Sequence, residues 1–152
     1  MKQIIDDILG DSSFPKGIAW EKKSFETGET IVHENDFAES LFFIKEGALQ
    51  VKIKLTNNDN ELTQNQIFLL KPGDIFGEAS LCQTGTRSAT VIADSNGSLV
   101  EIDGERLSIY LDAHPIQGYL FYKQLFGIQL SRVNNANLQI EKLISLTNFI
   151  KS

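Results

Sequence analysis

The sequence has few of the residues that build disulfide frameworks and metal centres. Cys82 is the single cysteine, and His33 and His114 are the only histidines among the 152 residues. One cysteine excludes an intramolecular disulfide, and two widely separated histidines argue against a structural zinc site or a histidine-rich catalytic metal site. We therefore expect neither a metal nor a catalytic centre, and we interpret Cys82 as a small loop or core residue rather than a nucleophile.

Basic charge and long apolar runs are also scarce. The chain has 20 acidic and 14 basic residues, so its formal net charge is -6, the wrong sign for gripping nucleic acid or anionic lipid. No segment approaches the ~18 apolar residues of a membrane span. Asp6 and Asp7 interrupt the apolar core that a signal peptide would need. These absences predict a cytoplasmic protein without a nucleic acid or membrane partner.

Short apolar runs bounded by turn residues occupy the middle of the chain. They predict strands over 30–33, 40–44, 48–55, 66–70, 89–93 and 98–102. Within the third run, Leu49, Val51 and Ile53 alternate with polar residues, so one face of that strand is buried and the other is solvated. The polar stretch 57–60 is interpreted as a hairpin tip. Many short strands at this spacing indicate a sandwich or a barrel.

Helical patterns flank the strands. Isoleucines at positions 4, 5 and 8 have helical spacing and predict one short N-terminal helix. A second helix is expected to end near His114, and Pro115 then suits the first turn of a third helix that no proline interrupts up to about position 150. Roughly 35 helical residues would span about 50 Å, which is longer than a domain of this size. The helix must therefore bend, with Gly127 the obvious place, or its far half must meet a partner.

Apolar residues on this long helix recur in alternating steps of four and three, at positions 126, 130, 133, 140 and 144, with Asn137 at one step. This is a short heptad-like stripe. The simplest interpretation is a helix packed on its own strands, whereas the resemblance described below implies that its second half is a dimer seam or a lid over the ligand.

The segment 76–91 carries the chemistry. Gly77 permits a close backbone approach to a ligand, and the residues after it resemble one helical turn whose N–H groups would face an anion. Arg87 supplies a planar cation that matches two phosphate oxygens, and Ser88 adds a hydroxyl donor. Glu78 fits this anion site if it accepts a hydrogen bond from a sugar hydroxyl. The residues alone thus predict a site for a phosphorylated sugar.

The order Phe-Gly-Glu-Ala-Ser-Leu over 76–81, followed by Arg-Ser-Ala-Thr-Val over 87–91, closely resembles the phosphate-binding cassette of cyclic nucleotide-binding domains. Further landmarks of that family stand at 25–31, 41–51, 70–76 and 99–103, so the resemblance extends over about 25–150. It is similar to the sensor domains of catabolite-activator-type regulators and of cyclic-nucleotide-dependent kinases. The fold implied is α+β and mainly β: an antiparallel β-roll, jelly-roll-like, with a short N-terminal helix and C-terminal helices that include one long helix.

The resemblance also implies roles for individual residues. Glu78 would bind the ribose 2′-hydroxyl, while Arg87 and Ser88 would bind the cyclic phosphate with help from the backbone of Gly77 and Ala79. Asn134 or Asn137 is expected to reach the purine base. The complete set of expected ligand-binding residues is Phe76, Gly77, Glu78, Ala79, Ser80, Arg87, Ser88, Ala89, Asn134 and Asn137.

The chain departs from the family pattern in two places. Asn35-Asp36 stands where a glycine-aspartate pair is frequent, and the turn should survive because asparagine tolerates a left-handed backbone. The chain also ends at Ser152, so we expect a single domain over 1–152 without an output domain. That domain divides into an N-terminal helical segment over 1–24, the β-roll over 25–103 and the helices over 104–152.

The expected function is a non-catalytic sensor that binds a cyclic mononucleotide, cyclic AMP in preference to cyclic GMP, without a cofactor. Occupancy would pass through the C-terminal helices to a homodimer partner or a separate effector protein. An alternative is a degenerate family member that acts as a protein-interaction or dimerisation domain without a nucleotide. A third, a cupin-type metalloenzyme, needs clustered histidine and glutamate ligands, and the two separated histidines disfavour it.

Overall fold

The computed structural model describes residues 1–56, 62–82 and 85–151. The hairpin tip expected at 57–60 lies outside these residues. The elements in chain order are α1 (Lys2–Leu9), β1 (Trp20–Phe25), β2 (Thr30–Val32), β3 (Ser40–Glu46), β4 (Leu49–Thr56), β5 (Leu62–Leu70), β6 (Ile75–Phe76), the 3-10 turn η1 (Glu78–Leu81), β7 (Thr90–Ala93), β8 (Gly97–Asp103), α2 (Gly104–Ala113) and α3 (Pro115–Lys151).

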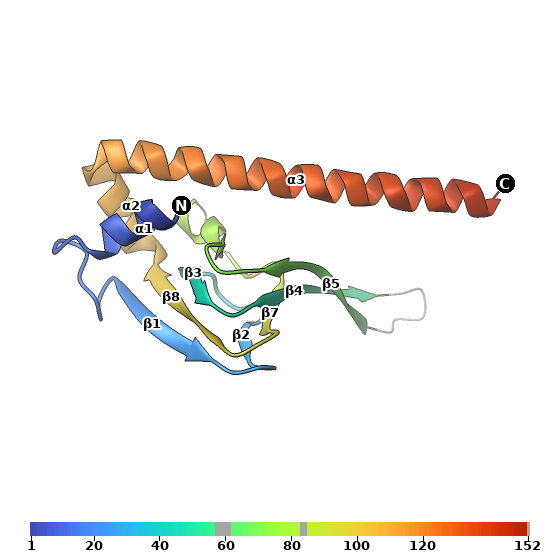
Figure 1. Cartoon of the computed structure of the whole chain (residues 1–152), viewed down its shortest axis with the longest axis horizontal. Coiled ribbons are helices and arrows are strands. Elements are labelled where there is room, and N and C mark those ends of the chain that lie inside the picture. The colour runs from blue at the N-terminus through green and yellow to red at the C-terminus, as the bar shows by residue number, and fades with distance from the viewer. Residues whose placement is uncertain (57–61, 83–84, 152) are drawn as a thin grey trace.

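The strands form two antiparallel sheets of four strands each, and the helices lie against one of them (Figure 1). One sheet has the order β1-β8-β3-β6 and the other the order β2-β7-β4-β5. Strands that are neighbours in space are mostly distant in sequence, as in a rolled-up double sheet. The predicted mainly-β roll with helices at both ends is confirmed.

Strand β3 explains how the roll and the helices share one core. Its apolar run Leu41–Ile44 is buried on both faces, as expected of a strand covered on both sides. Leu41 and Phe43 pack in the cluster with α1, α2 and α3, whereas Phe42 and Ile44 pack in the cluster between the sheets. Because successive side chains of β3 point to opposite faces, this one strand packs against both the helices and the interior of the roll.

The roll begins earlier than the sequence pattern indicates. Strand β1 starts at Trp20 rather than at Phe25, and its positions 21–24 are exposed because it is an edge strand that pairs only with β8. An edge strand with one buried end has no apolar alternation to detect. Strand β6, of only two residues, is too short to produce a pattern at all.

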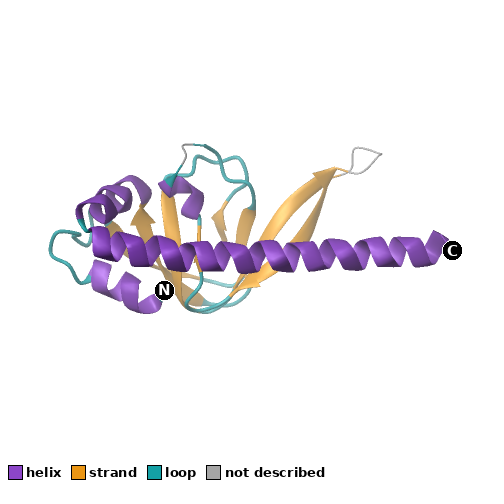
Figure 2. Ribbon diagram, turned by 90° about the horizontal axis from the view of Figure 1, so that it is seen from above, coloured by secondary structure: helices purple, strands orange, loops and turns teal. Residues whose placement is uncertain are grey.

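The helices follow the predictions at their ends. Helix α3 begins at Pro115, and His114 caps the C-terminus of α2. Helix α3 continues through Gly127 without a break, so the bend that was one of its two predicted alternatives is absent. Its C-terminal half projects beyond the body of the roll (Figures 1 and 2). Among the described residues, no helix combines the length and the apolar composition of a bilayer span.

The N-terminal segment is tied to α2 and α3 by one polar cluster. The Tyr110 hydroxyl lies 2.7 Å from Asp11 Oδ2 and 2.8 Å from Gln117 Oε1, and the His114 ring stacks on Tyr110 with 3.9 Å between centroids. Hydrogen bonds from the Ser13 backbone and from Tyr110 lower the pKa of Asp11 to about 2. Burial together with the bond to Asp11 raises the pKa of Tyr110 to about 12. The junction from which α3 departs is therefore firmly held.

Candidate functional site

The turn from β6 into η1 is built around Gly77. Its φ of 76° lies in the left-handed region, and a Cβ placed there would be 2.8 Å from an Arg87 guanidinium nitrogen and 2.9 Å from the Ser40 carbonyl oxygen. Only glycine gives both the backbone conformation and the close approach. Residues 78–81 then form the helical turn expected from the sequence, with the Ser80 hydroxyl donating to the Gly77 carbonyl at 2.8 Å.

Arg87 is held by groups that leave its charge unneutralised. Its Nη2 donates to the Ser40 carbonyl at 2.8 Å, and its guanidinium lies over the Phe42 ring, 5.4 Å from the centroid. Burial lowers the pKa of Arg87, and the carboxylates of Glu101, Asp36 and Glu78 oppose that effect. Over 1–56, 62–82 and 85–151, no carboxylate forms an ion pair with it. A half-buried cation in this state is a ready anion site.

The turn at Asn35 fixes the backbone of Arg87. Asn35 has φ 74°, which confirms the left-handed turn expected at this position. The Asn35 N–H donates to the Arg87 carbonyl at 2.9 Å, and the Arg87 N–H donates to the Asp36 carbonyl at 2.7 Å. This pair of backbone hydrogen bonds holds Arg87 beside Gly77, the residue that follows β6.

Two side chains of helix α3 contact Glu78. Arg132 donates to Glu78 Oε1 at 3.3 Å and to the Ile75 carbonyl at 2.6 Å, and its guanidinium lies 5.7 Å from the centroid of the Phe68 ring. Gln129, one turn earlier on the same face, also donates to Glu78 Oε1. Glu78 Oε2 has no hydrogen bond to the described residues and remains free to accept another donor.

These groups enclose an open pocket of about 150 Å³. Its walls are apolar side chains of the roll, and its charged groups come from the cassette and from α3. The lining residues are Val32, Val51, Phe68, Phe76, Gly77, Glu78, Arg87, Ser88, Ala89, Val91 and Arg132.

Six of the ten residues expected to bind the ligand lie at this pocket. Phe76, Gly77, Glu78, Arg87, Ser88 and Ala89 all line it. Ala79 is exposed and Ser80 is half-buried, and both lie in the turn beside the pocket.

Asn134 and Asn137 are both exposed on α3 and do not line the pocket. Asn134 is turned about 200° around the helix from Arg132, because successive residues are about 100° apart. A role for either asparagine at the base stays a prediction. It would have to be played in the pocket of a second molecule or after a rearrangement.

Sequence reasoning missed Gln129 and Arg132. Both lie on the face of α3 that also buries Gly118, Phe121 and Leu125, so they extend the line by which the helix packs on the roll. A polar pair spaced by three residues at the end of a buried helical stripe was the available signal.

The groups that line the pocket can recognise an anion and a hydroxyl. The pocket presents two guanidinium groups, of which that of Arg132 is paired with Glu78, together with a carboxylate that has a free oxygen, a hydroxyl and exposed backbone at a turn. No group of three or more histidine, cysteine, aspartate or glutamate side chains that could hold a metal ion is found in the part of the chain that the structure describes. Such a set of groups suits an anionic sugar phosphate.

Comparisons with known proteins agree with this geometry. Residues 22–114 match the family model described as "Cyclic nucleotide-binding domain". A cGMP-dependent protein kinase of Plasmodium berghei is 35% identical over 89 residues, which cover 59% of this chain and 9% of the kinase. The Cyclic AMP receptor protein of Thermus thermophilus is 23% identical over 124 residues, which cover 82% of this chain and 54% of that protein. The chain therefore spans about half or less of these curated relatives.

Solved structures show the same fold. The Thermus thermophilus Catabolite Activator Protein superposes with a TM-score of 0.66 at 22% identity, over 94% of this chain and 60% of that one. A putative cyclic nucleotide-binding protein of Geobacter metallireducens gives a TM-score of 0.62 at 23% identity, over 88% and 87% of the two chains. With the family match covering more than half of the sequence, this chain belongs to the cyclic nucleotide-binding domain family.

Proposed function

We propose that this domain is a non-catalytic sensor that binds cyclic AMP in the pocket between the cassette and α3. The observation that carries the proposal is the Arg87 guanidinium, which is half-buried in the pocket wall without a carboxylate partner among the described residues. In the bound state the cyclic phosphate would accept hydrogen bonds from Arg87 and Ser88. The ribose 2′-hydroxyl would donate to the free Oε2 of Glu78.

The character of the walls supports cyclic AMP over cyclic GMP. Val32, Val51 and Phe68 line the part of the pocket outside the cassette. Guanine carries more hydrogen-bonding groups than adenine, and each one that is buried without a partner costs free energy. The relatives divide between the two ligands by name, so the preference rests on the walls alone.

The pocket also supports a mechanism for transmission. At about 150 Å³ it is smaller than the roughly 300 Å³ at which ligand pockets begin, so a nucleotide needs additional space. Arg132, which lines the pocket and holds Glu78, belongs to α3. Space made by moving Arg132 changes how α3 is attached to the roll. Occupancy is then reported by the helix, because the ligand favours one position of the helix over the other.

The receiver that we propose is a second copy of this chain, joined through α3. The predicted stripe is exposed along its whole length, from Phe126 at 65% to Ile144 at 55%, and it lies to the side of the face that packs on the roll. A separate effector protein docking on the same helix is the alternative.

Calorimetric titration with cyclic AMP and cyclic GMP tests the ligand. We expect saturable binding that is tighter for cyclic AMP. Arg87→Ala should weaken it about 30- to 1000-fold, because a charge-assisted phosphate contact contributes about 2–4 kcal/mol. Arg106→Ala, which removes an exposed arginine of α2 outside the pocket lining, is the matched control and should leave the affinity unchanged.

Unchanged affinity in Arg87→Ala would refute the role of that residue. No heat with either nucleotide, together with a stable dimer, would support the alternative of an interaction domain without a nucleotide ligand.

A further inference from the structure

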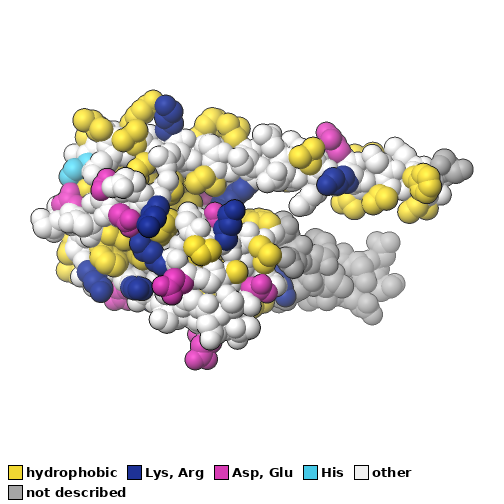
Figure 3. Space-filling model, viewed as in Figure 1, with side chains coloured by type: hydrophobic (Ala, Val, Ile, Leu, Met, Phe, Trp, Pro, Cys, Tyr) yellow, Lys and Arg dark blue, Asp and Glu magenta, His cyan; other side chains and the backbone are white. Residues whose placement is uncertain are grey.

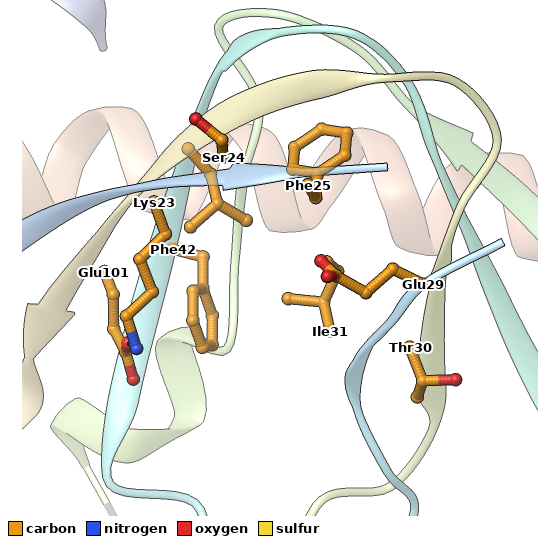
Figure 4. A pocket seen from close by; sticks show the side chains of 9 residues that line it. Lys23, Ser24, Phe25, Glu29, Thr30, Ile31, Phe42 and Glu101 are labelled. Carbon is orange, nitrogen blue, oxygen red and sulfur yellow. Dashed lines mark ion pairs between the residues drawn. The ribbon is translucent and has the colours of Figure 1, made fainter. Parts of the chain in front are cut away.

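A second pocket lies at the side of the roll, between the sheets, where β1 and β2 leave an opening over β3 and β8 (Figure 4). It has a volume of about 160 Å³. None of its lining residues belongs to the phosphate-binding cassette, so it is separate from the site described above.

The base of this pocket is apolar and aromatic. Phe25, Phe42 and Leu99 are buried core residues that also line it, and Ile31 adds a half-buried aliphatic wall. Aromatic rings present a negative face that attracts cations as well as apolar groups. The base therefore suits a ligand with a small apolar body.

The rim carries an excess of negative charge. Lys23 and Glu101 form an ion pair across β1 and β8, in which the bond to Glu101 raises the pKa of Lys23 and keeps it charged. Glu29, in the turn before β2, is exposed and makes no side-chain hydrogen bond or ion pair with the described residues. One positive and two negative groups leave the rim with a single unbalanced carboxylate.

We infer that this pocket binds a small organic ammonium ion, with its apolar body on the Phe42 ring and its charge beside the Glu29 carboxylate. The volume limits the body to about one ring or a short branched chain, since a cavity of ~150 Å³ accommodates benzene. A carboxylate on the rim and aromatic rings at the base are the two groups that bind ammonium ions in proteins.

The pocket is connected to the cassette through Phe42. The same ring lines this pocket and lies under the Arg87 guanidinium at 5.4 Å. Glu101, on the rim, is the carboxylate that most strongly offsets the effect of burial on the pKa of Arg87. A cation held by Glu29 lies in the same pocket as Glu101, so it weakens the attraction of Glu101 for Arg87 and makes the arginine a better partner for a phosphate. This extension rests on the proposed function, and the coupling must be reciprocal.

Binding is tested first without any nucleotide. Titration of the isotope-labelled protein with benzylammonium should give saturable amide shifts at Thr30, Ile31 and Phe42. Benzyl alcohol, a neutral probe of the same size, should bind about three- to tenfold more weakly, as expected for the loss of a cation–π and ion-pair contribution.

Two variants locate the probe. Glu29→Gln should weaken benzylammonium binding to the level of benzyl alcohol, whereas Glu26→Gln, which changes an exposed carboxylate of the same turn outside the pocket lining, should not. Ser24→Phe places a ring in the pocket from an exposed position of β1 and should abolish the shifts. Equal binding of the alcohol and the amine, or shifts that persist in Ser24→Phe, would overturn the site.

The coupling is tested second, by titrating cyclic AMP in saturating benzylammonium. We expect tighter nucleotide binding with the amine than with benzyl alcohol, and no difference in Glu29→Gln. Amine binding without any nucleotide binding would contradict the proposed function and leave the pocket intact. Nucleotide binding that is indifferent to the bound amine would overturn the coupling alone.

Discussion

At the scale of single residues, the cassette depends on backbone conformations that few side chains allow. Gly77 and Asn35 both have positive φ, and each brings a backbone segment against Arg87 from a different side. The guanidinium then has little room to move, and no carboxylate of the described residues forms an ion pair with it. The anion site is therefore a consequence of two turns as much as of one arginine.

Gly77→Ala tests this dependence. An alanine at φ 76° is strained by about 1–3 kcal/mol, and its Cβ would displace the Arg87 guanidinium, which lies 2.8 Å from that position. We expect a lower melting temperature and weaker cyclic AMP binding. Gly85→Ala is the matched control, because a Cβ there meets no atom within 4 Å and its φ is not positive. Equal losses in both variants, measured by thermal unfolding and calorimetry, would show that Gly77 has no special role.

At the scale of elements, the sequence predicts strands and helices that have a periodic hydrophobic pattern. It does not predict elements or contacts that depend on tertiary packing alone. The alternation in β4 and the uninterrupted helical spacing after Pro115 could be read directly, because each pattern records a buried face. Strand β1 could not be predicted in this way, because its middle residues are exposed and show no hydrophobic alternation. The cassette side of the site followed from residue types at fixed spacing. The α3 side of the site, Gln129 and Arg132, could not be predicted, because helical periodicity identifies a buried face but not the residues that this face contacts.

The contact of α3 with the cassette can be measured through Arg132. Arg132→Gln removes the ion pair to Glu78 and the bond to the Ile75 carbonyl, both of which are largely shielded from solvent. We expect hydrogen exchange of the α3 amides around Gln129 to accelerate about 5- to 30-fold, corresponding to about 1–2 kcal/mol of local stability. Lys142→Gln makes the same charge change at an exposed position of the same helix and should have no effect there. Identical protection in Arg132→Gln would mean that the apolar contacts alone hold the helix.

At the scale of the whole molecule, the two halves of α3 have different environments. The first half buries Gly118, Phe121 and Leu125 against the roll, whereas every described residue after Arg132 is exposed. Apolar side chains, yellow in Figure 3, lie on the surface of the projecting half. The described residues of the roll do not cover the apolar side chains of this half, and we propose that a partner covers them. Of the two predicted alternatives, a bend or a partner, the unbroken helix favours the partner that we propose.

The oligomeric state tests whether that partner is a second copy of this chain. We expect sedimentation to give twice the chain mass of 17.0 kDa. Val133→Glu should raise the dissociation constant of the dimer about 100-fold, because a carboxylate buried without a partner in an apolar seam costs about 3 kcal/mol. Asn135→Glu adds the same charge two positions later, about 200° around the helix, and should leave the dimer intact. A wild-type monomer would favour a separate effector protein, and equal dissociation in both variants would remove the stripe as the seam. A dimer that weakens only with Val133→Glu would mean that the α3 helices of the two subunits pack together. Movement of Arg132 at the cassette pocket of one subunit would then shift the α3 helix of the other subunit.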